Sequence, residues 1–409
     1  MKATEVTEGV WRLSANVDNL LFEGIWPIPH GIAMNSYIVK GEKCAIIDGV
    51  CGWDGVPETL FAQLDEMDIK LDDIEAVVVN HLEPDHTGWL ASFKKLKDDF
   101  TIYTSAKGAE LITAFYGIDH SRIHEVSSGD QLDLGDGRVF VFEEIPNVHW
   151  PETIATYDTK SKTLFPCDAF GSFGSVTDAP YDDQLTDEQI AFFESEAERY
   201  YSNIVGAFSV FVQRAVKKLE PLEIKIIAPA HGVVWRQNPG KILGDYIRYA
   251  GYSKGPAKPE VTVIWSSMYG MTETAVAHVV EGIESEGIKA RVFRVPETHL
   301  SYVLASVWET QGVVIGVPTY EYAMFPPMVS IVDELGRKKA QNRNAFRFGS
   351  YGWSGGAQKE LDELVAKNRM NWDFLDPVEF RGMPSDEDLK LVRQRGVELA
   401  QKVKETCGA

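Results

Sequence analysis

The sequence predicts an α/β protein of two domains, and three observations support this prediction. In the first 250 residues, short apolar runs typical of buried strands are followed by His, Asp or Glu. After residue 260, an apolar run leads into a hydroxyl-rich loop and then into apolar residues at helical spacing. The segment 251–260 between these regions is rich in Gly, Pro and Lys, which is typical of a linker. We therefore expect one domain at residues 1–255 and a second at 256–409.

The charge of the chain limits its partners. The 409 residues include 61 acidic and 40 basic side chains, which gives a net charge of −21. Nucleic acids and anionic membrane surfaces both require a positive face, so neither is an expected partner. The charge is uneven, because residues 1–250 carry 40 acidic and 21 basic groups (net −19) and residues 251–409 carry 21 and 19 (net −2). No apolar run reaches the roughly 18 residues that a membrane span needs, and no secretory signal is visible, so we expect a cytoplasmic protein.

The spacing of the cysteines excludes several metal and redox motifs. None of the four lies in a C-x-x-C pair, which excludes a rubredoxin-type iron site, a zinc ribbon and a thioredoxin motif in this sequence. Any redox chemistry here would have to receive its electrons from outside the chain.

The densest cluster of metal-binding residue types is His81-x-Glu83-x-Asp85-His86, directly after the apolar run 76–80. Four N or O donors so close together can surround two metals from a turn, and Pro84 disfavours a helix at this point. His149, Asp168 and His231 follow further apolar runs, and loops at strand ends can bring such side chains together at one edge of a sheet. A lone histidine is more often structural, but the hexapeptide predicts a metal site.

The donor set narrows the choice of metal. Four histidines and three carboxylates contain no thiolate, and Cys167 next to Asp168 is interpreted as a small buried hydrophobe. Two metals that share one carboxylate would each receive four donors and keep open positions. Such sites are typical of non-haem iron and of hydrolytic zinc, so both chemistries remain open at this point.

The second domain contains a predicted anion site. The apolar run 261–265 leads into a small, hydroxyl-rich loop, and Thr272 is the expected N-cap of the helix that follows. This loop has no Lys or Arg and matches no nucleotide-binding glycine motif, which suits a monophosphate that is held and not transferred. The loops after the runs 312–317 and 346–349 combine aromatic rings with glycine and could sandwich a flat ring in the crevice at the strand ends. The candidate binding residues of the three loops are Ser266, Met268, Tyr269, Gly270, Met271, Thr272, Pro318, Thr319, Tyr320, Ser350, Tyr351, Gly352, Trp353, Gly355 and Gly356.

The metal pattern resembles the metallo-β-lactamase fold in its flavodiiron variant (the A-type flavoproteins), and residues 259–405 resemble flavodoxin. Hydrolytic members of the fold usually carry histidine where this chain has Glu83, so the glutamate separates diiron oxidoreductases from zinc hydrolases. The resemblance implies an αββα sandwich followed by a flavodoxin-like, doubly wound sheet of five parallel strands. It further implies that FMN binds the second domain and that two irons bind the first. In this arrangement His81, Glu83 and His149 hold one iron, Asp85, His86 and His231 hold the other, and Asp168 bridges them.

The family resemblance also implies an activity. Flavodiiron proteins reduce dioxygen to water or nitric oxide to nitrous oxide, with electrons that reach the irons through FMN from an external donor. A rubredoxin, a flavin reductase or a reduced deazaflavin could be that donor, and the expected assembly is a head-to-tail homodimer or a dimer of dimers. The alternatives are a zinc-type hydrolase joined to a flavodoxin-like module, and a non-catalytic electron carrier or gas sensor. The sequence does not decide between O2 and NO.

Two further expectations concern the surroundings of the sites. The segment 22–37 resembles a family loop near the metal pocket, in which His30 and Trp26 could line the pocket or could simply pack. The less acidic second domain contains the basic run 337–343 and Arg347, where we expect an acidic electron donor to dock.

Overall fold

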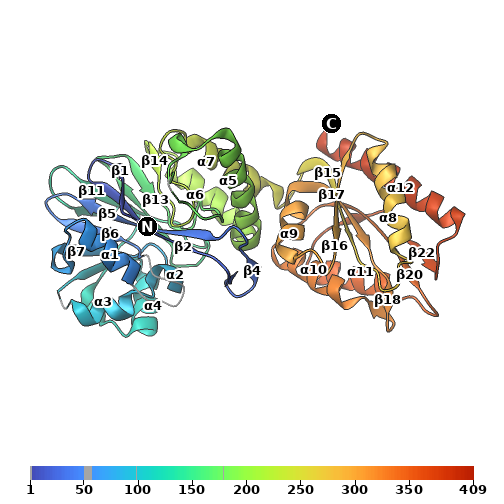
Figure 1. Cartoon of the computed structure of the whole chain (residues 1–409), viewed down its shortest axis with the longest axis horizontal. Coiled ribbons are helices and arrows are strands. Elements are labelled where there is room, and N and C mark those ends of the chain that lie inside the picture. The colour runs from blue at the N-terminus through green and yellow to red at the C-terminus, as the bar shows by residue number, and fades with distance from the viewer. Residues whose placement is uncertain (1, 50–57, 98, 178) are drawn as a thin grey trace. The chain divides into compact units, whose positions relative to one another are not determined.

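The chain forms two compact units, residues 1–247 and 248–409 (Figure 1). The computed structural model describes residues 2–49, 58–97, 99–177 and 179–409. The predicted boundary after residue 255 lies between α7 (Pro239–Tyr252) and β15 (Lys258–Trp265). Within the described ranges, no helix combines the length and the apolar character that crossing a membrane would require.

The N-terminal unit contains two large sheets. The strands of the first, in spatial order, are β1 (Thr4–Thr7), β2 (Val10–Val17), β5 (Ile32–Lys40), β6 (Cys44–Ile47), β7 (Ile74–Val78), β8 (Thr101–Thr104) and β9 (Ile123–Glu125). This sheet is antiparallel from β1 to β6 and parallel from β6 to β9. The second sheet consists of β10 (Gln131–Asp133), β11 (Val139–Glu144), β12 (Ile154–Asp158), β13 (Thr163–Phe165) and β14 (Ile226–Ile227).

The two sheets pack face to face, and helices cover their outer sides. One buried cluster contains Val39 and Val78 of the first sheet together with Phe140 and Phe165 of the second, so the core lies between the sheets. Burying each such side chain stabilises the fold by about 1.5–3 kcal/mol. On one side lie α1 (Glu58–Glu66), α3 (Leu90–Leu96) and α4 (Ala106–Tyr116), and on the other α5 (Asp187–Tyr200), α6 (Ser209–Leu219) and α7 (Figure 1). The predicted αββα sandwich is confirmed.

Shorter elements connect these layers. They are β3 (Leu21–Phe22), β4 (Trp26–Pro27), α2 (Pro84–Thr87), 3₁₀ turns at Leu71–Asp73, His120–Arg122, Asp182–Gln184 and Gly206–Phe208, and a π-helical turn at Tyr201–Val205.

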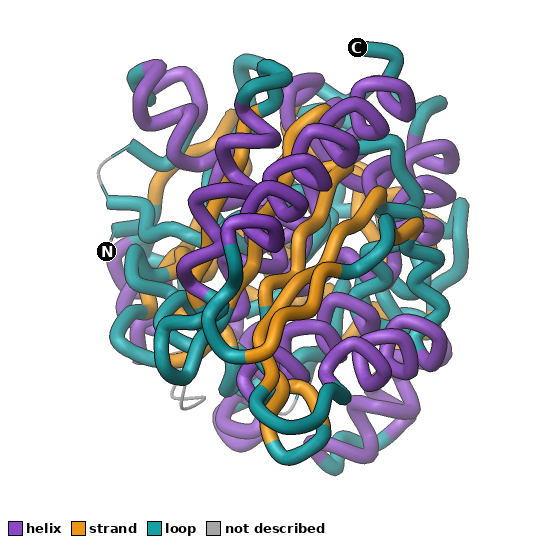
Figure 2. Tube along the Cα trace, turned by 90° about the vertical axis from the view of Figure 1, so that its right-hand side faces the viewer, coloured by secondary structure: helices purple, strands orange, loops and turns teal. Residues whose placement is uncertain are grey.

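The C-terminal unit is built on one parallel sheet (Figure 2). Its strands follow the order β16 (Lys289–Arg294), β15, β17 (Thr310–Gly316) and β20 (Asn344–Tyr351). The fifth position is shared by β21 (Asp373–Phe374) and β22 (Val378–Arg381), which pair with successive parts of β20. The predicted five-position parallel sheet is thus confirmed, with its last strand in two pieces.

Helices cover both faces of this sheet, as the doubly wound prediction requires. The helices α8 (Glu273–Glu284) and α12 (Asp386–Cys407) lie side by side and pack their apolar faces on β15, β17 and β20. On the other face are α9 (Leu300–Glu309), α10 (Pro326–Arg337) and α11 (Ala357–Lys367). A small hairpin of β18 (Thr319–Tyr320) and β19 (Ala323–Met324) follows β17.

Candidate functional site

The hexapeptide at 81–86 is positioned by the end of β7 and by one buried asparagine. The Asn80 backbone N–H donates to the Asp48 carboxylate (2.8 Å), and its side-chain amide donates to the Phe165 carbonyl (3.1 Å). The Thr156 hydroxyl donates to the Asn80 side-chain oxygen (2.7 Å). Asn80 therefore ties the end of β7 to β12 and β13 of the second sheet, which holds the next residue, His81, between the two sheets.

The prediction that these ligands sit on a turn and not on a helix is wrong for two of them. Asp85 and His86 lie on α2, a single helical turn that Glu83 precedes at the N-cap position. Pro84 is the first helical residue, where a proline has no N–H to lose and its fixed φ suits the helix. The short helix directs Asp85 and His86 to one region, while Glu83 stays on the extended segment before it.

Asp168 lies at the centre of the predicted ligand set. Its Oδ1 atom is 2.8 Å from His86 Nε2 and 3.3 Å from His231 Nε2. Its Oδ2 atom is 3.1 Å from His149 Nε2 and 3.6 Å from His81 Nε2. One carboxylate thus faces two histidines with each of its oxygens, which is the arrangement expected of a bridging ligand.

The other two carboxylates complete two matched groups. Glu83 Oε2 lies 3.0 Å from His149 Nε2 and 3.4 Å from His81 Nε2. On the other side, the Asp85 oxygens lie 3.4 Å from His86 Nε2 and 3.5 Å from His231 Nε2. Within each group the ligand atoms, including Asp168 in the first, all lie within 4.8 Å of one another. We call the group of His81, Glu83 and His149 the first subsite, and that of Asp85, His86 and His231 the second subsite.

The electrostatics of the cluster fit a cation. Burial would lower the pKa of His86, but Asp85 and Asp168 outweigh it and raise that pKa to about 9. The pKa of His149 is likewise raised to about 9, against the effect of burial, by Asp168 and Glu83. Burial raises the pKa of Asp85, and the surrounding histidines hold the pKa of Asp168 well below its usual range in spite of burial. The raised pKa values of His86 and His149 favour protonated imidazoles, whose charge offsets that of the buried carboxylates, and metal cations can take over that role.

Side chains around the ligands include several that the sequence did not single out. Glu152 is buried, and its Oε1 accepts hydrogen bonds from His81 Nδ1 (2.8 Å) and from the Leu82 backbone N–H (2.9 Å). The His231 Nδ1 atom lies 3.2 Å from the Ala33 carbonyl oxygen. In the sequence, the signal that could have pointed to Glu152 was its position three residues after His149, a predicted ligand.

Tyr200, at the end of α5, also borders the cluster. Its ring centroid is 5.7 Å from that of His231. Among the described residues, nothing forms a hydrogen bond with its buried hydroxyl. Burial, with Asp168 as the leading charged neighbour, raises the pKa of this phenol well above its ordinary value. The π-helical turn that begins at Tyr201 follows at once, and such turns frequently mark functional sites.

The loop residues proposed to line the pocket are placed differently. Trp26 is fully buried and donates to Glu23 Oε2 (2.9 Å), whereas His30 is exposed with its ring against Phe192 (centroids 5.3 Å apart). Phe22 of the same segment packs its ring against His231, with centroids 5.7 Å apart.

The C-terminal unit has a pocket of about 380 Å³ at the carboxyl ends of its strands. Of the predicted binding residues, nine line it: Met268, Tyr269, Met271, Thr319, Tyr320, Ser350, Tyr351, Gly352 and Trp353. Glu321 and Gly382 also line it and were missed. Trp353 and Tyr269 are 74% and 83% exposed, so large ring faces are free to cover a flat ligand.

The remaining predicted residues support this pocket from behind or beside it. Thr272 occupies the N-cap position of α8, but its hydroxyl bonds to the Ser350 hydroxyl (3.0 Å) and makes no cap hydrogen bond. Gly356 packs so closely that a Cβ atom would lie 1.9 Å from the Tyr322 carbonyl oxygen, and its φ is +156°. The Ser266 hydroxyl at the end of β15 is buried and has no hydrogen-bond partner among the described residues, which suits a phosphate oxygen at this loop. Ser266, Gly270, Pro318 and Gly355 are not among the lining residues.

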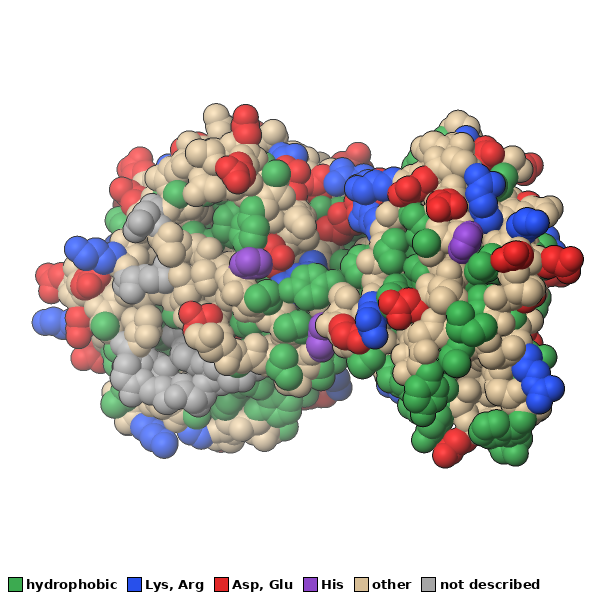
Figure 3. All heavy atoms as spheres, turned by 45° about the vertical axis from the view of Figure 1, so that its right-hand side comes forward, with side chains coloured by type: hydrophobic (Ala, Val, Ile, Leu, Met, Phe, Trp, Pro, Cys, Tyr) green, Lys and Arg blue, Asp and Glu red, His purple; other side chains and the backbone are tan. Residues whose placement is uncertain are grey.

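The expected docking site for an electron donor needs correction. Arg343 is fully buried and donates to the backbone carbonyls of Tyr252 and Trp308 (2.7 and 2.9 Å), and Arg347 is 9% exposed and pairs with Asp362. These two guanidinium groups stabilise the unit and cannot contact a partner. Figure 3 shows red and blue side chains interspersed on the visible face of this unit. Of the basic run, Arg337 and Lys339 are exposed.

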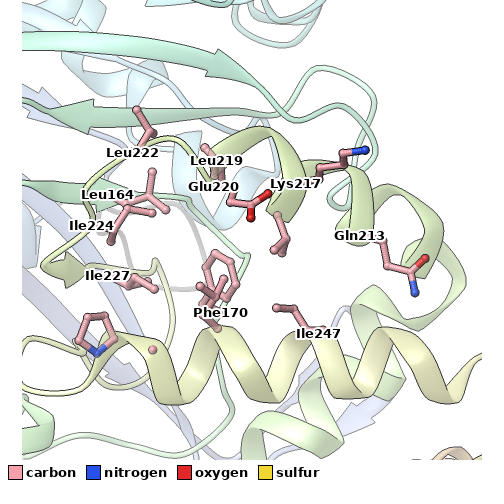
Figure 4. Close-up of a pocket in the computed structure, with 14 residues that line it drawn as sticks. Leu164, Phe170, Gln213, Lys217, Leu219, Glu220, Leu222, Ile224, Ile227 and Ile247 are labelled. Atoms are coloured by element: carbon pink, nitrogen blue, oxygen red, sulfur yellow. The ribbon is translucent and has the colours of Figure 1, made fainter.

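A separate, mainly apolar cavity of about 570 Å³ lies between α6, α7 and the ends of β13 and β14 (Figure 4). Leu164, Ile227 and Ile247 contribute to its wall, and Phe170 points into it from the loop that follows Asp168. None of the seven predicted ligands lines it, so this cavity is distinct from the metal cluster.

Comparison with known proteins gives consistent relatives for both units. The family described as ODP family beta lactamase matches residues 32–232, and the flavodoxin family matches residues 263–394. The anaerobic nitric oxide reductase flavorubredoxin of Escherichia coli K12 is 31% identical over 376 residues, which are 91% of this chain and 76% of that protein. The rubredoxin oxygen:oxidoreductase of Desulfovibrio gigas is similar over 100% of both chains, with a TM-score of 0.93 and 25% identity. The flavodiiron protein of Giardia intestinalis is similar over 100% of this chain and 98% of that one, with a TM-score of 0.92 and 25% identity.

Proposed function

The chain belongs to the flavodiiron protein family, and on that premise we propose that it is an oxidoreductase that reduces dioxygen, nitric oxide or both at a non-haem diiron site. The observation that carries this proposal is the pair of matched ligand groups that meet at Asp168. Each has two imidazoles, one carboxylate of its own and one oxygen of Asp168. Glu83 in the first subsite supports iron over the zinc of the hydrolytic relatives, because a hard carboxylate stabilises the higher oxidation state.

The residues have distinct roles in this proposal. The first subsite would hold one iron, the second subsite the other, and Asp168 would bridge them. Two bound irons supply the change of oxidation state and the open positions at which O2 or NO is reduced to water or nitrous oxide, with electrons that arrive through FMN. Phe22 and Tyr200, whose rings pack against His231, limit the access of water to the second subsite.

The flavin pocket has a matching assignment. Trp353 and Tyr320 would cover the isoalloxazine ring, and the loop from Ser266 to Thr272 would hold the phosphate at the N-terminus of α8. The buried Ser266 hydroxyl, for which the described part of the chain offers no hydrogen-bond partner, supports this assignment.

The donor, assembly and location are part of the proposal. The name of the Desulfovibrio gigas protein includes rubredoxin, and a rubredoxin-type donor suits a second domain that carries less negative charge than the first. A flavin reductase or a reduced deazaflavin is the alternative donor. We further propose a head-to-tail homodimer or a dimer of dimers in the cytoplasm.

The test is metal and flavin analysis followed by parallel assays. Purified protein should contain about two irons and one FMN per chain and should consume O2 or NO when one reduced donor is supplied. Steady-state turnover with each gas under the same donor then decides which substrate is preferred. Protein that contains zinc, hydrolyses thioesters or phosphodiesters and consumes neither gas would instead support the hydrolase alternative.

A further inference from the structure

The two subsites have the same set of donors but different support behind them. Both offer two imidazoles, one carboxylate of their own and one oxygen of Asp168. One difference between them lies in the groups that hold the ligands. The structure shows this difference behind His81 and His231, one fully buried histidine of each subsite.

In the first subsite, His81 is held by a carboxylate. Its Nδ1 atom donates to Glu152 Oε1 at 2.8 Å, so Nε2 is directed at Glu83 and Asp168. The Leu82 backbone N–H donates to the same oxygen (2.9 Å) and fixes the carboxylate in place. A carboxylate behind a ligating imidazole orients the ring and increases its basicity toward the metal.

Glu152 is also a buried charge that needs a positive neighbour. The residue is 1% exposed, and burial of a carboxylate is costly unless a cation or hydrogen bonds compensate it. His81 is the side chain to which it is hydrogen-bonded, so the charge is best compensated when His81 carries a proton or a metal ion. A metal ion in the first subsite therefore stabilises Glu152 as well as its direct ligands.

In the second subsite, the corresponding support is neutral and longer. His231 Nδ1 lies 3.2 Å from the Ala33 carbonyl oxygen. Asp48, a buried carboxylate that interacts electrostatically with His86, accepts its hydrogen bond from the Asn80 backbone N–H (2.8 Å). A backbone carbonyl orients an imidazole but brings no net charge to it.

We propose that the first subsite binds its metal ion more tightly than the second, and that Glu152 is the positioning residue responsible. The inference rests on the two-metal site of the proposed function and adds an order of loading to it. The first subsite fills first, and the second subsite loses its ion first.

The test is anaerobic titration of metal-free protein with Co²⁺, followed by calorimetry. The wild-type protein should bind two ions in two resolved steps. Glu152→Gln keeps the size of the side chain and the acceptor for His81 Nδ1 but removes the charge. It should weaken the tighter step by about 10- to 100-fold and leave the other step nearly unchanged.

Single-subsite variants assign each step to a place. His231→Ala disables the second subsite and His149→Ala disables the first, so His231→Ala should retain the tighter step. Adding Glu152→Gln should weaken binding in the His231→Ala background and should have little effect in the His149→Ala background. Tighter binding by His149→Ala than by His231→Ala would overturn the proposal, even if Glu152→Gln itself failed to fold.

Asp48→Asn is the matched control. It removes a buried carboxylate of the same pocket that is not hydrogen-bonded to a ligand, so the tighter step should stay nearly unchanged. An equal loss of metal affinity in Glu152→Gln and Asp48→Asn would show that any buried negative charge near the site strengthens metal binding. The hydrogen bond between His81 and Glu152 would then have no particular role.

Protein that reduces O2 or NO normally but binds two metal ions with equal affinity would contradict this inference alone. An inactive protein with two unequal steps would contradict only the proposed function.

Discussion

Six of the seven predicted metal ligands of the N-terminal unit are buried and the side chain of the seventh, Glu83, is 13% exposed, whereas the large rings of Tyr269 and Trp353 at the predicted flavin pocket of the C-terminal unit are mostly exposed. His81 and His231 are fully buried, while Trp353 is 74% exposed. The metal ligands are already at 2.8–3.6 Å from their neighbours. In the flavin pocket, by contrast, the aromatic rings that would stack on a flavin are exposed to solvent.

This difference follows from the two kinds of ligand. Buried carboxylates that lie near one another repel unless cations balance their charge. Such a cluster therefore requires rigid strands, and hydrogen-bonding groups behind the ligands, to hold it in place. A flavin contributes its own large aromatic surface, so its site can consist of exposed rings on loops at the strand ends. The metal cluster should therefore respond steeply to single changes and the flavin pocket more gradually.

The largest expected effect is the loss of Asp168. Asp168→Ala removes the oxygens that face all four histidines, so the binding of both metal ions should become weaker together. We expect turnover to fall by at least about 100-fold, because changes outside the ligand set already cost about 10- to 100-fold in affinity or activity. Elemental analysis should show little iron, and flavin absorbance should be unchanged. Full iron content in this variant would contradict the bridging role.

A smaller but distinct effect is expected at Tyr200. Tyr200→Phe removes a buried hydroxyl that has no hydrogen-bond partner among the described residues and whose pKa is raised by burial and by the charge of Asp168. Iron content and thermal stability should be kept or should increase, because an unsatisfied buried hydroxyl is costly. Turnover should fall about 10-fold or more if the hydroxyl donates to the reacting gas. Wild-type turnover would limit Tyr200 to packing.

Removal of the metals should make stability depend on pH. His86 and His149 have an ordinary pKa of 6.5 that is raised to about 9 in the fold, so their protonated forms stabilise the metal-free protein. This stabilisation is complete below about pH 6.5 and is lost as the pH rises through about 9. Calorimetry of metal-free protein should show the unfolding temperature decreasing over this range by about 2–4 °C for each kcal/mol lost. Metal-loaded protein is the control, and the same decrease there would contradict the explanation.

The flavin pocket should respond more weakly. Trp353→Ala removes one exposed ring and should weaken FMN binding by roughly 3- to 10-fold, which corresponds to about 0.5–1.5 kcal/mol of aromatic contact. Trp353→Phe is the matched variant and should recover most of the affinity. Fluorescence titration of flavin-free protein gives both constants. A loss above 100-fold, or a loss of iron, would show that the two units are less independent than the comparison implies.

The smallest effect is expected for the basic run. Reversal of the exposed charges in Arg337→Glu with Lys339→Glu should slow reduction by an acidic rubredoxin by less than about tenfold and should weaken its salt dependence. Lys390→Glu, on α12 at the other face of the sheet, is the control. Equal rates for both variants would place the docking site elsewhere. Stopped-flow kinetics at several salt concentrations measures each rate.

The two sites also differ in how far they could be predicted from the sequence. That the seven candidate ligands lie together could be predicted because they follow buried strands, and the strand ends meet at one edge of the sandwich. Glu152 was not, because its role depends on how the loop after His149 folds back to reach His81. The expectation of exposed charge was wrong for Arg343 and Arg347, because Arg343 is fully buried and Arg347 belongs to β20 inside the sheet, whereas Arg337 and Lys339 are exposed as expected. The sequence of a strand does not show which of its charged side chains the folded sheet will enclose.

The order of the ligands along the chain has a consequence for synthesis. All residues of the first subsite, together with Asp168, precede α5, while His231 follows α6. During synthesis from the N-terminus, the residues of the first subsite and Asp168 are therefore translated well before the second subsite is complete. Because domains generally fold as units, both subsites form only when His231 and the core residues beside it, such as Ile226 and Val234, have also been translated.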